Sequence, residues 1–230
     1  MPEFLSPAEI SALQLSIKIA LTAVLAELPF AIFFAFILAR GKFFGRDIIN
    51  ILIHLPLVLP PVVTGYFLLL LFGNNGPIGE ILSKYFGVSL AFRWTGAALA
   101  SAIMALPLMV RAIRLSIESV DSQIEDAART LGANSIMVFF SITLPLSYRG
   151  LLVGTILGFA KGLGEFGATI TFVSNIPGET QTLPSAIYGY IQSPGGDLPA
   201  LRLAVLSVLV SVAALAFSEL LARIHRAKSA

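Results

Sequence analysis

Cysteine is absent from this sequence, and charged residues are scarce. Without cysteine, the chain can form neither a disulfide scaffold nor a thiolate metal site. Aspartate, glutamate, lysine and arginine make up 12% of the 230 residues, about half the roughly 25% of a typical soluble domain. Hydrophobic residues make up 57%. This composition predicts an integral membrane protein.

Histidine is also rare, and the motifs of common cofactor sites are missing. The two histidines, His54 and His225, lie far apart in the sequence, so no metal site is expected. No G-x-x-x-x-G-K-[ST] motif is present, which excludes ATP binding by a P-loop. Residues 162–167 match G-x-G-x-x-G, but that motif must follow a strand, whereas this copy ends an apolar run. We therefore expect no cofactor, no catalytic site and, at a net charge of +2, no nucleic-acid partner.

Long hydrophobic runs predict about five membrane-spanning helices. Most of them reach the roughly 20 residues that a helix needs to cross a bilayer. The predicted spans cover residues 11–39, 48–72, 95–110, 150–172 and 201–221. Pro56, Pro60 and Pro61 interrupt the second span and predict a broken helix there. The expected fold is an all-α membrane protein with a single domain, residues 1–230.

Two stretches between the spans are expected outside the hydrocarbon region. Residues 78–94 have the composition of an external loop that ends at an interfacial aromatic anchor, Trp94. Residues 182–192 have a helical pattern but are too few to cross the bilayer. A short re-entrant or interfacial helix is therefore expected there.

The distribution of lysine and arginine predicts the orientation of the chain. One side carries Lys84 and Arg93, with Arg202 at the membrane edge, whereas many more basic residues gather on the other side. That second group contains Arg40, Lys42, Arg46, Arg111, Arg114, Arg129, Arg149, Arg223, Arg226 and Lys228. Because positively charged loops stay in the cytoplasm, we expect a cytoplasmic C-terminus and an N-terminus outside.

Residues 121–145 form a charged interruption between two apolar spans. Glu125 and Asp126 place negative charge in the first turns of a short helix, and Gly132 can end that helix in a left-handed conformation. A second apolar run then leads to Pro145, which can close one helical segment and start the next. The pattern predicts a helix–turn–helix elbow on the cytoplasmic side.

Glycine recurs at every fourth residue in the first part of the fourth predicted span. Residues at this period share one face of a helix, and the missing side chains let another helix approach closely. The four glycines are Gly150, Gly154, Gly158 and Gly162. We interpret them as a helix-packing ridge, either within one subunit or between subunits.

Ionisable residues at membrane depth are candidate functional groups. Glu27 lies in the first span, and Lys161 and Glu165 lie four residues apart in the fourth, where mutual pairing is the simpler interpretation. The segment that follows is rich in glycine, hydroxyl and amide groups, which suit either weak binding of an oxyanion or close helix packing. Its candidate translocation residues are Gly164, Glu165, Gly167, Thr169, Thr171, Ser174 and Asn175.

The elbow resembles the "EAA loop" of bacterial ABC-importer permeases. The resemblance lies in Ala127-Ala128, Gly132 and the run from Ile142 to Pro145, at the spacing of the family. It implies a coupling helix that sits in a groove of a separate ATPase subunit. The implied contact residues are Glu125, Asp126, Ala127, Ala128, Arg129, Gly132, Ile142, Leu144 and Pro145. The glutamate of the family pattern falls at Asp126, with Glu125 one residue earlier, so which carboxylate has the family's role stays open.

Nearly the whole chain is similar to the permease subunits of molybdate ABC importers, above all in residues 55–65, 127–133 and 164–180. Membership would imply a homodimer in the cytoplasmic membrane of a bacterium or archaeon. The implied partners are two ATPase subunits and a periplasmic or surface-tethered oxyanion-binding protein. Related tungstate and sulfate permeases share the elbow and are alternatives. A gradient-driven anion transporter that uses Glu27, Lys161 and Glu165 is a further alternative, but the chain shows no internal repeat.

Overall fold

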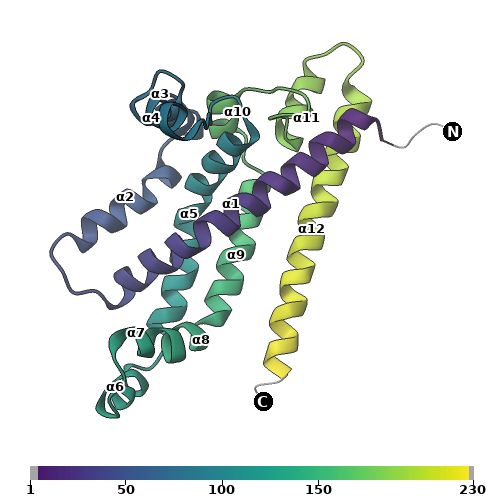
Figure 1. The fold of residues 1–230 in the computed structure, drawn as a ribbon. Helices are drawn as coiled ribbons and strands as arrows, with labels where there is room; N and C mark the ends of the chain where they lie inside the picture. Colours follow the sequence, from purple (N-terminus) through teal and green to yellow (C-terminus); the bar gives the residue numbers. More distant parts are fainter. Residues whose placement is uncertain (1–4, 228–230) are drawn as a thin grey trace.

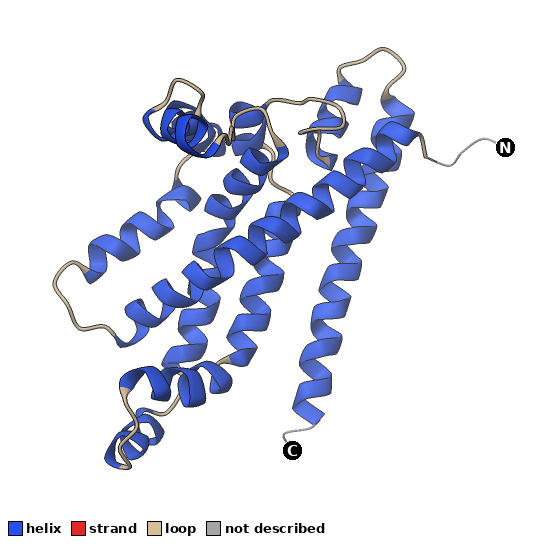
Figure 2. Ribbon diagram, in the orientation of Figure 1, coloured by secondary structure: helices blue, strands red, loops and turns tan. Residues whose placement is uncertain are grey.

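The computed structural model describes residues 5–227 and folds them into a bundle of helices (Figure 1). Within this range no strand occurs (Figure 2), in agreement with the all-α expectation. Lys228, and the side chains of Arg223, His225 and Arg226, lie outside what the structure describes.

The helices α1, α5 and α9 form the centre of the bundle, and α12 packs beside α9 and α11. The segments are α1 (Pro7–Arg40), α2 (Arg46–Val58), α3 (Pro61–Phe72), α4 (Pro77–Phe86), α5 (Trp94–Glu118), α6 (Ser122–Thr130), α7 (Ser135–Val138), the π-helix η1 (Phe139–Thr143), α8 (Leu144–Leu146), α9 (Tyr148–Leu163), α10 (Gly167–Val173), α11 (Leu183–Ile191) and α12 (Asp197–Ala227). At one end of the bundle lie α3, α4, α10 and α11, and at the other lies α6 (Figure 1).

The long first helix begins at a capping box. The backbone N–H of Ser6 donates to Glu9 Oε2 at 2.6 Å, and the N–H of Glu9 donates to Ser6 Oγ at 3.3 Å. Glu9 also pairs with Arg202 at 3.0 Å, which ties the start of α1 to α12. With 34 residues, α1 is about 50 Å long, well beyond the roughly 30 Å hydrocarbon core of a bilayer.

The predicted break in the second span is confirmed. Helices α2 and α3 meet at an angle of 112°. Pro60 and Pro61 cause the bend because neither residue has a backbone N–H to continue the α2 ladder. Pro61 instead starts α3, a position that suits its fixed φ.

Two expectations about segment boundaries are wrong. Residues 78–94 are not only loop, because α4 covers Pro77–Phe86 and is followed by Gly87, which has the left-handed φ of +65°. The fourth span is not continuous from residue 150 to residue 172, because α9 ends at Leu163 and α10 begins at Gly167. The Glu165 side chain accepts a hydrogen bond from the N–H of Ala168 at 3.0 Å, and this contact caps α10.

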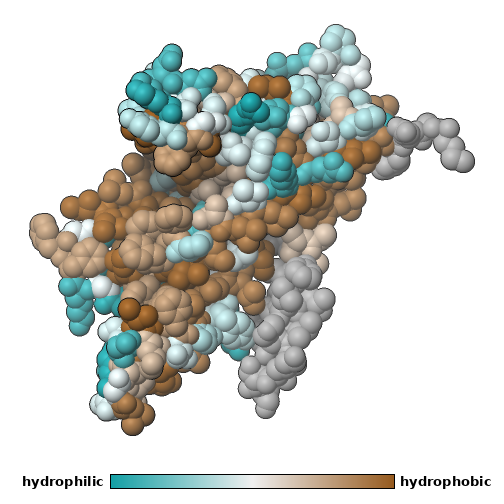
Figure 3. Space-filling view, viewed as in Figure 1, coloured by the Kyte–Doolittle hydropathy of each residue, from teal (hydrophilic) through white to brown (hydrophobic). Residues whose placement is uncertain are grey.

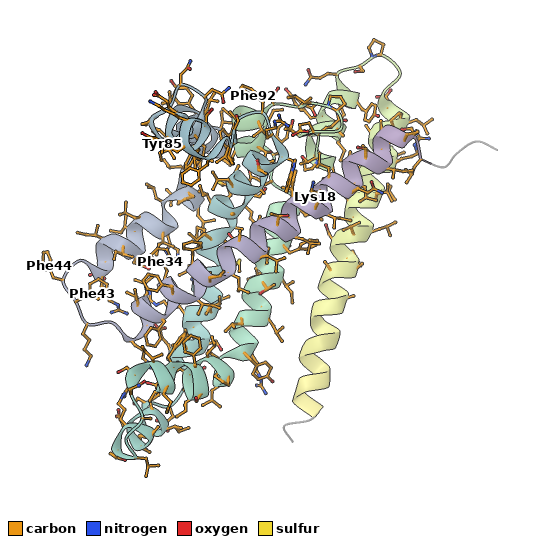
Figure 4. The ribbon with its side chains drawn as sticks, in the orientation of Figure 1. Lys18, Phe34, Phe43, Phe44, Tyr85 and Phe92 are labelled. Carbon is orange, nitrogen blue, oxygen red and sulfur yellow. The ribbon has the colours of Figure 1, made fainter. Side chains whose placement is uncertain are left out.

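Three helices are long and apolar enough to cross a membrane: α1, α5 and the described part of α12. The number rises to five at most if each of two bent helix pairs, residues 46–72 and 135–163, forms one span. Five is the expected count, but the expected fourth span covered residues 150–172 and not residues 135–163. A broad hydrophobic surface covers the middle of the molecule, and hydrophilic residues gather near α4 (Figure 3). Exposed aromatic side chains lie in the loop after α1, at Phe43 and Phe44, and near α4, at Tyr85 and Phe92 (Figure 4).

Candidate functional site

The elbow starts with α6, a nine-residue helix that is capped at both ends. The side chain of Asp121 accepts a hydrogen bond from a backbone N–H two residues later, at 2.9 Å. At the other end, the N–H of Ala133 donates to Ala128 O and the N–H of Gly132 donates to Arg129 O, each at 3.0 Å. With a φ of +93° at Gly132, this pair of bonds is a Schellman motif. The glycine thus ends α6 in the conformation that the sequence pattern predicts.

Replacing Gly132 by alanine should lower the free energy of unfolding by about 1 kcal/mol, because a left-handed φ strains any residue with a Cβ. An added Cβ would meet no atom within 4 Å, so the cost is conformational and not steric. Asparagine tolerates this region better and should cost less. Thermal unfolding of the purified chain in detergent measures both effects. Equal stability of the glycine, alanine and asparagine forms would contradict the cap.

The two neighbouring carboxylates of the elbow differ in burial, although Arg129 lies within 4 Å of both. Glu125 is 3% exposed. Its Oε1 accepts hydrogen bonds from Arg40 at 3.1 Å and from the hydroxyl of Thr143 at 2.8 Å. Asp126 is exposed and pairs with Arg129 at 2.6 Å. Glu125 therefore holds α6 against α1 and η1, whereas Asp126 lies on the exposed surface of the helix.

The second half of the elbow returns the chain to the bundle. Its residues Ile142 and Leu144 are half-buried and Pro145 is exposed. The hydroxyl of Ser147 donates to Thr143 O at 2.7 Å, and the hydroxyl of Ser116, on α5, donates to Ser147 O at 3.2 Å. These bonds fix the end of the elbow to α5. The outward surface of the elbow contains Asp126, Ala127, Arg129, Leu131 and Ile136, all exposed.

The four ridge glycines lie buried on one face of α9. Gly150, Gly154 and Gly158 face α5, and Gly162 lies between α1 and α5. An added Cβ at Gly150 would lie 2.2 Å from Ser116 Cβ, whereas at Gly162 the nearest atom, in Ala20, would be 3.5 Å away. The ridge thus packs α9 inside the subunit, and its tightest point is next to the elbow.

The candidate translocation residues surround the break between α9 and α10. Gly164 is exposed, and Glu165 is buried, where it pairs with the half-buried Lys161. The hydroxyls of Thr169 and Thr171 both donate to backbone carbonyls of their own helical turn, at 2.8 and 2.9 Å. These two hydroxyl protons are therefore already used within α10.

Beyond α10 the chain turns sharply at Ser174, which is exposed and has a φ of +65°. The amide nitrogen of Asn175 donates to Ser185 O at 3.2 Å, and its buried Oδ1 has no hydrogen-bond partner among the described residues. Among the same residues, no group of three histidine or acidic side chains could hold a metal ion.

The two broken spans meet where α3 packs against α10. An added Cβ at Gly65 would lie 2.5 Å from Ala168 O, and one at Gly167 would lie 2.7 Å from Pro61 Cβ. Only glycine allows this approach from either side. Gly65 did not stand out in the sequence, because a single glycine in an apolar run gives no sign of its neighbour.

The chain is similar to known transport proteins along most of its length. Residues 28–226 match the family model described as "Binding-protein-dependent transport system inner membrane component". The chain is 56% identical over 225 residues to the molybdenum transport system permease protein ModB of Escherichia coli (strain K12), with 98% of each chain covered. It is 55% identical to the ModB protein of Haemophilus influenzae, with 94% of each covered.

A solved structure of a bacterial ABC transporter that imports the polysaccharide alginate shares the fold. The TM-score is 0.76 at 15% identity, and the match covers 96% of this chain and 80% of the other. At this identity the likeness concerns the fold alone. From the family match and the near full-length relatives, the chain belongs to the family of inner membrane components of binding-protein-dependent transport systems.

Proposed function

We propose that the chain is the permease subunit of an ATP-driven importer that moves molybdate, a tetrahedral oxyanion, into the cytoplasm. Two relatives that are 55–56% identical over nearly their whole length bear the name of molybdenum transport permeases, which supports the substrate. The family supports a carrier that hydrolyses no ATP itself and depends on a separate ATPase subunit. The cytoplasmic membrane of a bacterium or archaeon is its proposed location.

The elbow is the observation that carries the proposal. An exposed charged helix, α6, is tied through the buried Glu125 to Arg40 of α1 and to Thr143 of η1. A partner that contacts Asp126 and the exposed Leu131 can therefore shift α6 and the end of α1 together. This contact fits an ATPase subunit whose closure on ATP must be passed to the membrane helices. In the assembled importer we expect two permease copies, two ATPase subunits and an oxyanion-binding protein.

The orientation is part of the proposal. The end of the bundle that carries α6 would face the cytoplasm, and the start of α1 would lie outside. The basic residues Arg40, Arg114 and Arg149 lie at or near the helix ends next to the elbow, whereas Lys84 lies on α4 at the other end. Positively charged loops favour the cytoplasmic side, which supports this direction.

The test uses the chain reconstituted in liposomes with its ATPase subunit and binding protein. We expect the molybdate-loaded binding protein to stimulate ATP hydrolysis, and Asp126→Lys to reduce this stimulation about tenfold by reversing the charge that this position presents to the ATPase subunit. Glu80→Lys, the same charge reversal on the exposed face of α4 at the other end of the bundle, is the matched control. It should leave co-purification of the ATPase subunit unchanged.

Three outcomes count against the proposal. The docking role fails if Asp126→Lys leaves both co-purification and stimulated hydrolysis unchanged. The substrate is wrong if tungstate or sulfate stimulates hydrolysis and molybdate does not. An ATP-driven mechanism fails if the chain alone, in vesicles without ATP, accumulates the anion under a pH gradient.

A further inference from the structure

Glu27 is an anomaly in the helical core. Its side chain lies near the middle of α1, is 4% exposed, and neither carboxylate oxygen has a hydrogen-bond partner among the described residues. The other buried carboxylates, Glu9, Glu125 and Glu165, each pair with a lysine or arginine. Because an unpaired charge in a protein interior is strongly unfavourable, a group like Glu27 requires an explanation.

The surroundings of Glu27 contain one candidate partner. Its Oε1 lies 3.0 Å from the position that a Cβ on Gly158 would take, next to the Met109 sulfur of α5. The α5 residues 94–110 carry no charge, and in α9 residues 150–163 Lys161 is the only charged residue. Lys161 lies three residues after Gly158, about 4.5 Å further along the helix axis. On α1 itself the nearest charge is Lys18, which is labelled in Figure 4. Its Nζ is 3.6 Å from the Trp94 ring centroid.

Along the chain, Lys161 therefore lies between Gly158, which is next to Glu27, and its own partner Glu165. It now pairs with Glu165, which belongs to the non-helical segment between α9 and α10. Long side chains in a helix normally point back toward its N-terminus, which for Lys161 is the direction of Gly158 and Glu27. The pair with Glu165 thus depends on the break after Leu163, whereas the reach toward Glu27 follows the ordinary helical direction.

The two carboxylates differ in what remains when the lysine leaves. Glu165 keeps the hydrogen bond from the Ala168 N–H, and its neighbour Gly164 is exposed, so water can reach it when the break changes shape. Glu27 is enclosed by α1, α5 and α9 and has no substitute partner among the described residues. Glu165 can therefore remain charged when Lys161 is elsewhere. Glu27 must instead be neutral whenever Lys161 is not beside it.

We propose that Lys161 moves between Glu165 and Glu27 as the break between α9 and α10 changes shape during the transport cycle. Glu27 holds a proton while Lys161 is on Glu165. When the lysine arrives, Glu27 gives this proton to water that enters as the break changes shape. Lys161 is then a positioning residue: its pairing with Glu165 stabilises one conformation of the break, and its pairing with Glu27 stabilises the other. The link to transport rests on the proposed function, whereas the exchange of partners concerns this chain alone.

The test is chemical labelling of Glu27 in the full chain assembled with its ATPase subunit. Dicyclohexylcarbodiimide, an apolar reagent, modifies protonated carboxyl groups in apolar surroundings, and mass spectrometry of the peptide that contains Glu27 measures the labelled fraction. We expect the fraction to differ about tenfold between the nucleotide-free complex and the complex with a non-hydrolysable ATP analogue, because the two states hold Lys161 on different partners. Glu9, buried but paired with Arg202, is the internal control and should stay unlabelled.

Variants at Lys161 make the test decisive. Lys161→Met should leave Glu27 highly labelled with and without nucleotide, and Lys161→Arg should restore the difference. Equal labelling of Glu27 in both states of the wild type, or a difference that survives in Lys161→Met, overturns the proposal. No oxyanion is added, so the outcome does not depend on whether molybdate is the substrate.

A double-mutant cycle gives a second readout if the reagent does not reach Glu27. Glu27→Gln and Lys161→Met should each slow substrate-stimulated ATP hydrolysis, and the double variant should be no slower than the worse single variant, because both remove the same contact. Effects that multiply would show independent roles and would contradict the exchange.

Discussion

Replacing Glu125 by alanine is expected to remove stimulated ATP hydrolysis and to destabilise the elbow. The substitution takes away the acceptor for Arg40 and for the hydroxyl of Thr143, and hydrogen bonds to a charged group contribute about 1.5–3 kcal/mol each. Since Arg40 is partly exposed, we expect a total loss of about 2 kcal/mol in the free energy of unfolding. Thermal unfolding and the hydrolysis assay of the assembled complex measure the two effects.

The neighbouring position supplies the control for this experiment. Asp126→Ala removes a carboxylate of the same helix that is exposed to solvent, so stability should change by less than about 0.5 kcal/mol. Glu125→Gln keeps an acceptor oxygen for Thr143 and should recover part of the stability. If Glu125→Ala and Asp126→Ala were equally stable, Glu125 would not be the residue that fixes α6.

Replacing Gly150 by alanine should be among the most damaging single-methyl changes in the chain. The new Cβ would lie 2.2 Å from Ser116 Cβ and 2.8 Å from Ala112 O, so α5 and α9 would have to separate. Overpacking of this kind costs about 1–3 kcal/mol, and loss of the 3.2 Å hydrogen bond that the Gly150 N–H donates to Ser116 Oγ adds to it. We expect lower yield of folded protein and a lower melting temperature.

Gly162 on the same face of α9 is the matched control. Its added Cβ would lie in ordinary contact, 3.5 Å from Ala20, and alanine favours a helix over glycine by about 0.5–1 kcal/mol. Gly162→Ala should therefore be neutral or slightly stabilising under the same measurement. Equal losses at Gly150 and Gly162 would mean that the ridge does not set the distance between α5 and α9.

Features that depend on neighbouring residues could be predicted from the sequence. The cap at Gly132 follows from a short charged helix before a glycine, and the bend in the second span follows from Pro60 and Pro61. The number of candidate spans follows from long apolar runs, because span length depends on bilayer thickness and not on tertiary contacts.

Features that depend on residues far apart in the sequence could not be predicted from it. The partner of Glu125 is Arg40, 85 residues earlier, so its burial has no sign in the local pattern. The break before Gly167 was missed because the glycine period up to Gly162 favours one continuous helix, whereas the cap that Glu165 gives to α10 becomes visible only in three dimensions. Glu27 stood out only as an ionisable residue, and its lack of a partner required the packing of α5 and α9.

The bend between α2 and α3 also limits where lipid can lie. The carbonyls of Pro56 and Leu57 would normally bond to the N–H groups four residues later, but those residues are Pro60 and Pro61. Acyl chains offer no donor to such carbonyls, so hydrocarbon is a poor solvent for this part of the surface. The bend itself should therefore be wetted or covered by polypeptide, whereas the exposed apolar side chains along α2, such as Ile51 and Leu52, can still face detergent or lipid.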